Sequence, residues 1–208
     1  MTTTNSESSG FLGNVLLKKI LLTCGILASQ LYIGMNIFIP NLYEGYNAAS
    51  QTVSEMSAVG APTRFLWVVL GTIYTLLITA FGIGIIKTAG QNLLLRILGI
   101  LMTASGIIGL AWTPMHQRAV IAAGGATFTD TWHLVMGGIT LLLMMFLIGI
   151  GAAALDRRFR MYSIISIIIF LVFGTLTGVE APDVAKNLPT PMIGVWERIN
   201  IGVYMIWL

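Results

Sequence analysis

Long stretches without a single charged residue are the feature that most constrains this chain of 208 residues. A helix needs about 20 consecutive apolar residues to cross the hydrocarbon core of a membrane. Five stretches reach or approach that length, namely 20–43, 65–86, 97–115, 131–155 and 161–179. A sixth, 199–208, is half a span, and becomes nearly adequate if its helix begins at Pro191 or Met192. The sequence therefore predicts an all-α, polytopic transmembrane six-helix bundle whose last helix is short or truncated.

The predicted domain organisation is simple. Residues 1–10 are small and polar, which favours a disordered cytoplasmic tail. Residues 11–208 then form a single transmembrane domain, with spans at about 20–40, 65–86, 94–113, 130–154, 161–178 and 192–208.

The charged residues are distributed unevenly between the loops on the two sides of the predicted bundle. They make up only 9% of the chain, against about 25% in a soluble domain. The loops on the side of the N-terminus carry more Lys and Arg (18, 19, 87, 96, 157, 158 and 160) than those on the other side (64, 118, 186 and 198). Because cytoplasmic loops are enriched in Lys and Arg, the N-terminus is predicted to be cytoplasmic and the protein to lie in the cell (inner) membrane. The basic balance thus indicates topology, and no nucleic-acid partner is expected.

The first outer loop contains a helix-start signal. Thr52-x-x-Glu55 fits a capping box, and Gly60 and Pro62 would end the short helix that follows. One interpretation is a re-entrant or interfacial helix that closes the top of the bundle. The alternative places Ser54 and Glu55 in an outer pocket as nucleophile or polar ligand, where activation of Ser54 would need an adjacent base.

The two histidines lie at the outer boundary. His133 follows Asp130 by three residues, so both share a helix face and the carboxylate could orient the imidazole. In the structural interpretation Asp130 caps the helix and His133 donates to it. A zinc site would need about three protein ligands, and His116 and His133 are the candidates, with one of Asp130, Glu180 or Asp183 as the third. Because no HxxxH or HExxH spacing is present, no metal and no cofactor are expected.

The last outer segment, 180–191, is rich in prolines and leads to Glu197 and Arg198. Neighbouring residues on a helix do not face each other, so each of these two charges must find a partner elsewhere in the bundle or extend outward to the membrane surface. Small residues inside the spans favour close helix packing over ligand binding; they are Gly25, Ser29, Gly82, Gly106, Gly109, Gly137 and Gly138.

Several stretches carry a family resemblance: GYNAASQTVSEMSAVGAPT after the first span, TPMH and DTWH around the next outer loop, and TPMIGVWERINIGVYMIW at the end. In this order they resemble the domain-of-unknown-function (DUF) family 998 of bacterial and archaeal multi-pass membrane proteins. The resemblance implies a multi-pass fold without an assigned mechanism, and a closing helix that continues further. The chain is more loosely similar to Frag1/DRAM/Sfk1-type membrane proteins, through Ser54-Glu55 and the later histidine. That similarity implies a role connected with membrane lipids.

These features predict an outward-facing polar pocket formed by Ser54, Glu55, His116, Asp130, His133, Glu197 and Arg198. The pocket is expected to bind a membrane lipid or a membrane partner, either another protein or a second copy of the chain. The first alternative is an intramembrane lipid hydrolase or transferase that uses Ser54, Glu55, Asp130 and His133 as catalytic residues. The second is a small-solute transporter.

Overall fold

The computed structural model is all-α, as predicted. It describes residues 3–208, with the side chains from residue 13 onward. The α-helices are α1 (Thr3–Phe38), α2 (Arg64–Thr88), α3 (Leu93–Gly109), α4 (Arg118–Val120), α5 (Phe128–Ala154), α6 (Arg157–Ala185) and α7 (Ile193–Trp207). Three shorter helical segments are η1 (Ile39–Leu42), η2 (Val53–Ser57) and η3 (Ile121–Gly125). In residues 3–208 β-structure is limited to an isolated bridge between Val59 and His116.

Four segments of the described chain are long and apolar enough to cross a membrane: Gly13–Leu42, Arg64–Thr88, Phe128–Ala154 and Arg157–Ala185. Helix α3 is apolar but has 17 residues, which corresponds to about 25 Å. Helix α7 has 15 residues, or about 22 Å. The lengths and the apolar composition of these helices indicate a membrane protein. The ribbon of α1 begins at Thr3, but the side chains of residues 1–12 lie outside the described part, and the disordered tail stays a prediction.

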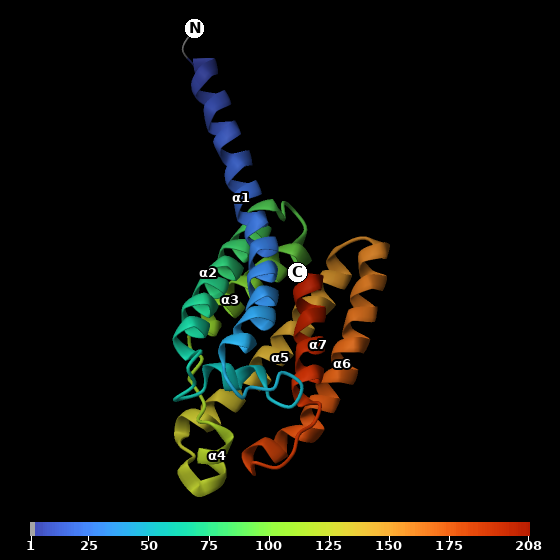
Figure 1. Ribbon diagram of the computed structural model, residues 1–208. Coiled ribbons are helices and arrows are strands. Elements are labelled where there is room, and N and C mark those ends of the chain that lie inside the picture. Colours follow the sequence, from blue (N-terminus) through green and yellow to red (C-terminus); the bar gives the residue numbers. More distant parts are fainter. Residues whose placement is uncertain (1–2) are drawn as a thin grey trace.

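The loops gather at two opposite ends of the bundle (Figure 1). The long connections 39–63, 110–127 and 186–192 lie together at one end, which we call the loop end. The N-terminus, the short turns 89–92 and 155–156, and the C-terminal residue of α7 lie toward the other, which we call the terminal end. This grouping is the one that the charge-free stretches predict.

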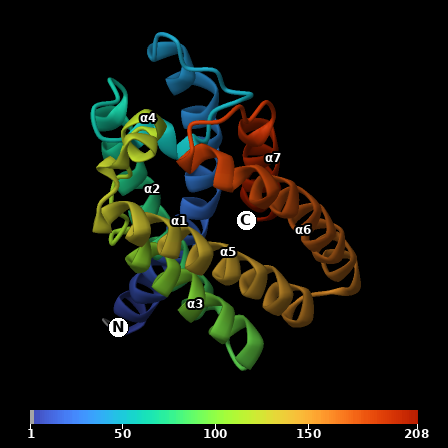
Figure 2. The same ribbon diagram turned by 90° about the horizontal axis from the view of Figure 1, so that it is seen from below.

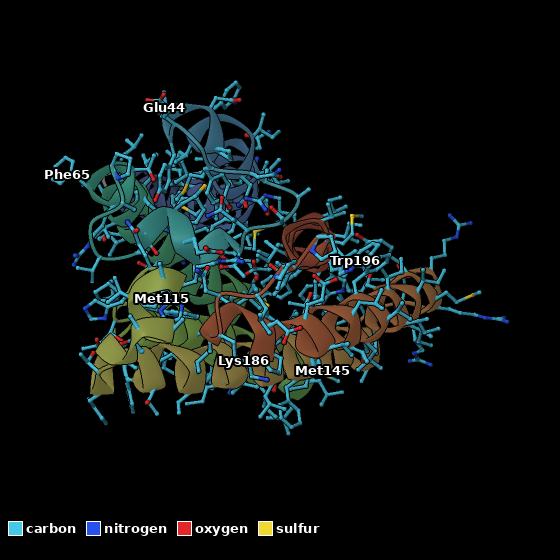
Figure 3. All side chains as sticks on the ribbon, turned by 60° about the horizontal axis from the view of Figure 1, so that its bottom comes forward. Glu44, Phe65, Met115, Met145, Lys186 and Trp196 are labelled. Atoms are coloured by element: carbon cyan, nitrogen blue, oxygen red, sulfur yellow. The ribbon has the colours of Figure 1, made fainter. Side chains whose placement is uncertain are left out.

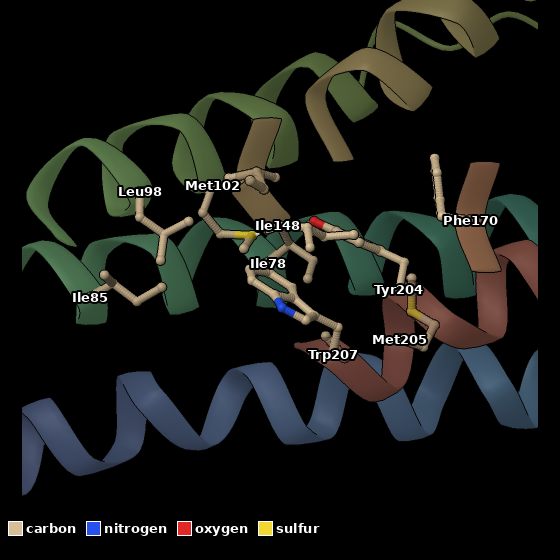
Figure 4. Packing of buried hydrophobic residues seen from close by; sticks show 11 residues of the cluster. Ile78, Ile85, Leu98, Met102, Ile148, Phe170, Tyr204, Met205 and Trp207 are labelled. Atoms are coloured by element: carbon tan, nitrogen blue, oxygen red, sulfur yellow. Dashed lines mark hydrogen bonds between the residues drawn. The ribbon is translucent and has the colours of Figure 1, made fainter. Parts of the chain in front are cut away.

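The helices pack in chain order around a central core. Helix α2 packs against α1 and α3, α5 connects α3 to α6, and α7 packs against α6 and α1. Figure 2 shows α5 running between the group α1, α2 and α3 and the pair α6 and α7. The core between them is apolar (Figure 4) and includes Ile78, Leu98, Met102, Ile148, Phe170, Tyr204, Met205 and Trp207.

Glycines let α2 and α3 approach closely. A Cβ atom on Gly82 would lie 2.5 Å from the backbone nitrogen of Thr103, and one on Gly99 would lie 2.9 Å from the carbonyl oxygen of Gly82. The predicted close packing is therefore confirmed at Gly82, and likewise at Gly25, Gly106 and Gly109. The prediction of close packing is wrong for Gly137 and Gly138 in α5. A Cβ on Gly137 would meet only Trp112 at 3.8 Å, and one on Gly138 would meet nothing within 4 Å.

Helix α6 is longer than the sequence indicates, and this corrects the predicted loop at 180–191. The helix continues through Pro182 to Ala185. It ends in a Schellman motif, in which Leu188 N donates to Asp183 O (2.9 Å) and Asn187 N to Val184 O (3.1 Å). Asn187 takes the required left-handed conformation, with φ of 55°. The stop signal was therefore an asparagine, a residue that tolerates positive φ, rather than the proline five residues before it.

Candidate functional site

Glu55 caps the short helix η2, as its position after Thr52 predicts. Its Oε2 atom accepts hydrogen bonds from the backbone nitrogen of Thr52 (2.7 Å) and from Thr52 Oγ1 (3.1 Å). Gln51 Nε2 donates to Oε1 at 3.2 Å. The side chain is only 5% exposed, so the cap also buries a carboxylate that needs a cationic partner.

That partner is Arg118, at the start of α4. Its Nε donates to Glu55 Oε1 (2.8 Å) and its Nη2 to Glu55 Oε2 (2.7 Å), which makes a bidentate ion pair. Burial by itself raises the pKa of the Glu55 carboxyl, but the hydrogen bonds from Arg118 and from the Thr52 backbone outweigh it and hold that pKa below its ordinary value. Glu55 is therefore a buried anion whose acceptor positions are occupied, and it cannot serve as a free base.

Arg118 also joins the three loops of the loop end. Nη2 donates to Ser50 O (3.2 Å) and Nη1 to Thr190 Oγ1 (3.0 Å). Thr190 in turn donates to the same Ser50 carbonyl at 2.8 Å. From the sequence alone, Arg118 was one of the basic residues of the outer loops and was not a predicted site residue. The available signal was that the outer loops contain more acids than bases, so that a basic residue there would find an acidic partner.

Glu197 and Arg198 find separate partners in the first outer loop, as predicted. Glu197 Oε2 accepts from Val53 N at 2.7 Å. Arg198 Nη1 donates to Ala48 O (2.7 Å) and Nη2 to the hydroxyl of Tyr46 (2.7 Å). These bonds attach the N-terminal half of α7 to the loop. The side chains of Glu197 and Arg198 are therefore both engaged in structural contacts.

Asp130 pairs with His116 and not with His133, which corrects the expected pairing. Asp130 caps α5 by accepting from Thr127 N (2.7 Å), as predicted, and its Oδ1 also accepts from His116 N (2.6 Å). His116 Nδ1 lies 2.9 Å from Asp130 Oδ2. An N-capping carboxylate points back toward the chain that precedes the helix, and here the 113–118 loop lies against it. The residue one turn further along, His133, is therefore out of reach.

His133 faces the protein interior, with 6% of its surface exposed. Its Nδ1 lies 2.6 Å from the carbonyl oxygen of Thr113, and its ring packs edge-on against Trp112 with 4.7 Å between centroids. Nδ1 therefore carries the hydrogen and donates it. This bond satisfies a carbonyl just beyond the C-terminus of α3, where helical partners are missing.

The predicted pocket thus separates into two clusters. One contains Glu55, Glu197 and Arg198 with the added Arg118, and the other contains Asp130, His116 and His133. The loop from 113 to 118 contributes to both, and Val59 N donates to Met115 O (2.8 Å) beside it. Figure 3, in which the loop end comes forward, shows oxygen and nitrogen atoms gathered between the labelled Met115 and Trp196.

Ser54 has no activating neighbour in the described part of the chain. It is half-buried, and its recorded contact is through the backbone, where its carbonyl oxygen accepts from Ser57 Oγ at 2.9 Å. The predicted combination of Ser54 with an adjacent base is not assembled among these residues.

A cavity of about 70 Å³ opens beside the Glu55–Arg118 pair and is large enough for a few water molecules or a group of similar size. Side chains with polar groups contribute most of its lining residues, which are Tyr43, Gln51, Glu55, Gln117 and Arg118, with Ala119. Among residues 13–208, no group of three or more His, Cys, Asp or Glu side chains lies close enough to hold a metal ion. The candidate third ligand Glu180 instead accepts from Met192 N at 3.3 Å.

The apolar helices and the polar clusters at one end define the chain as an all-α membrane protein. It belongs to the family described as "Protein of unknown function (DUF998)", whose family model matches residues 26–208. No curated protein and no solved structure matches the chain significantly. The looser similarity to Frag1/DRAM/Sfk1-type proteins finds no support in these comparisons.

Proposed function

We propose that this membrane protein is not an enzyme and binds the phosphate of a lipid headgroup in the cavity at the loop end. The observation that carries the proposal is the set of unused hydrogen-bond donors around that cavity. The Tyr43 hydroxyl and the Gln117 amide line it, and neither side chain makes a hydrogen bond within residues 13–208. Arg118 uses four of its five N–H groups, which leaves one hydrogen on Nη1.

Charge supports the same ligand class. Glu55 neutralises Arg118, so the cavity offers neutral donors and one guanidinium N–H rather than a free positive charge. Such a site suits a phosphate that belongs to a zwitterionic headgroup, because the ligand brings no net charge to be neutralised. The hydrolase and transferase alternative would need Ser54 beside a base, and the geometry described above gives no such pair. No observation favours the transporter alternative.

The membrane arrangement is part of the proposal. We infer that α1, α2, α3, α5, α6 and α7 all cross the cell membrane, with the N-terminus in the cytoplasm and the loop end outside. The support is the excess of Lys and Arg at the terminal end and the position of both described chain ends toward that end (Figure 1). Helices α3 and α7 are the short spans, and their loop-end boundaries are held by the 113–118 loop and by Arg198.

Cysteine labelling tests the orientation. In a Cys24→Ala background, Ala123→Cys in η3 and Arg158→Cys at the start of α6 each place one thiol at an exposed position. We expect an impermeant maleimide to label Ala123→Cys on intact cells and to label Arg158→Cys only after lysis. Labelling in the reverse pattern would place the loop end in the cytoplasm.

Lipid binding is tested by native mass spectrometry of the full chain released from nanodiscs that contain phosphatidylethanolamine and phosphatidylcholine. We expect the double variant Tyr43→Phe/Gln117→Ala to retain bound phospholipid about tenfold less than the wild type, since two hydrogen bonds of about 0.5–1.5 kcal/mol each are lost. Gln91→Ala, an exposed amide at the terminal end, is the matched control and should behave as the wild type. Equal retention in all three proteins, or a co-purified protein in place of lipid, would contradict the proposal.

A further inference from the structure

A second and larger cavity, of about 220 Å³, lies near the terminal end of the bundle. Its walls come from the parts of the helices nearest that end: Thr88 is the last residue of α2, Leu155 follows α5, and Trp207 is the last residue of α7. The lining also includes Leu22, Leu95, Leu98 and Phe159. In the membrane arrangement proposed above, this end of the bundle lies close to one membrane surface.

The two side-chain hydrogen-bond donors in the wall of this cavity are both engaged within the protein. Thr88 Oγ1 donates to Gly84 O at 2.9 Å, and Trp207 Nε1 donates to Ser163 Oγ at 2.9 Å. The other lining side chains are apolar. An apolar cavity of this kind stays dry and accepts apolar molecules. A methylene group takes about the volume of a water molecule, roughly 30 Å³. The cavity volume of about 220 Å³ therefore corresponds to about seven methylene groups.

Seven basic residues lie within about one helical turn, along the chain, of residues that line the cavity. Lys18 and Lys19 precede Leu22 by about one turn, Lys87 adjoins Thr88, and Arg96 adjoins Leu95. Arg157, Arg158 and Arg160 flank Phe159. Six of these seven side chains are exposed, and Lys18 is half-exposed.

No carboxylate forms an ion pair with these cations in the described part of the chain. The salt bridges of residues 13–208 are the two at the loop end. Asp156, the acid nearest to these cations, accepts from the backbone nitrogens of Arg158 and Phe159. Arg96 and Arg160 donate to the carbonyls of Gly90 and Ala152, which carry no charge. These seven cations, which we call the basic rim, therefore have no ion-pair partner among residues 13–208.

We propose that this cavity holds the end of one acyl chain of an anionic phospholipid, whose phosphate lies against the basic rim. The apolar wall selects the chain, and charge complementarity selects the headgroup. Basic clusters next to membrane helices attract anionic lipids, but such attraction alone would not need a cavity. The combination distinguishes a specific site from the general enrichment of cytoplasmic loops in Lys and Arg. This site is separate from the loop-end cavity, so either proposal can fail without the other.

Quenching of tryptophan fluorescence tests the site. The full chain is placed in phosphatidylcholine nanodiscs, and phosphatidylglycerol with brominated acyl chains is added in increasing fractions. Trp207 lines the cavity and is 5% exposed, so its signal, taken as the difference from Trp207→Phe, reports a chain inside. We expect saturable quenching, with half-saturation at a fraction about tenfold lower than for brominated phosphatidylcholine.

Two substitutions in α3 distinguish binding of an acyl chain inside the cavity from contact with lipid at the surface of the protein. Leu98→Phe adds volume inside the cavity, whereas Leu94→Phe makes the same change one turn away at a side chain that is 40% exposed. Leu98→Phe is expected to abolish the saturable quenching and Leu94→Phe to leave it unchanged. Lys87→Gln/Arg96→Gln, which changes exposed side chains only, should raise the half-saturation several-fold without lowering the maximum. Equal quenching by both lipids, or an unaltered response in either Leu98→Phe or the rim variant, would overturn the proposal.

Discussion

Replacing Glu55 by glutamine is expected to lower the thermal-unfolding midpoint of the protein in detergent micelles by roughly 6–20 °C. The loss of one partner leaves the buried guanidinium of Arg118 without its anion, which costs about 3–5 kcal/mol, and each kcal/mol corresponds to about 2–4 °C in a chain of this size. Glutamine still fits the capping box at this position. The measured loss therefore reports the missing charge and not the missing cap.

A double-mutant cycle supplies the control for this prediction. Arg118→Gln should destabilise by a similar amount, because it leaves Glu55 as an unpaired buried carboxylate at 5% exposure. The double variant should lose less than the sum of the two single variants, with a coupling of about 0.5–3 kcal/mol. Strict additivity would show that the two side chains do not interact in the folded protein.

The same pair sets a dependence on pH. Because the pKa of Glu55 is lower in the folded protein than its ordinary value of 4.5, its stabilisation is fully present above pH 4.5 and is lost as the pH falls through the folded pKa. The unfolding midpoint of the wild type should therefore fall in that acidic range more steeply than that of Glu55→Gln. An identical pH profile for the two proteins would contradict the assigned ion pair.

Replacing Gly82 by alanine is expected to lower the unfolding midpoint by roughly 2–12 °C. The added methyl group would lie 2.5 Å from the backbone of Thr103 and 2.8 Å from the carbonyl oxygen of Gly99, so that α2 and α3 must separate. Overpacking of this kind costs about 1–3 kcal/mol and occasionally more, and here it also removes the gain that alanine normally brings to a helix.

Gly71→Ala, in the same helix, is the matched control. A Cβ atom there would meet nothing within 4 Å. This substitution should leave the midpoint unchanged or raise it slightly, since alanine is favoured over glycine inside a helix by about 0.5–1 kcal/mol. Similar midpoints for Gly82→Ala and Gly71→Ala would show that α2 and α3 do not make the close contact.

Local patterns in the sequence predicted local structure well. The charge-free stretches predicted the long helices, because apolar side chains need a solvent or a partner that is apolar along the whole length of the helix. The Thr52–Glu55 capping box depends on contacts three residues apart, and the structure confirms it. The close approach at Gly82 was also predicted, but the sequence alone gave no reason why Gly138 should differ. That difference depends on which side of each helix meets a neighbour.

Only the tertiary structure decided how the polar residues at the loop end pair. Glu55 and Arg118 are 63 positions apart, and the bond between them requires the first and second outer loops to meet. Asp130 was predicted to pair with His133 because the two share a helix face. In the structure its carboxylate points toward the 113–118 loop and pairs with His116. The amino-acid sequence by itself determined the apolar helices apart from the end of α6, the caps at Glu55 and Asp130, and the end at which each loop lies, since these follow from contacts within a few residues and from the apolar surroundings. The partners of the buried charges were settled by helix packing, which brings together groups whose separation along the chain carries no local signal.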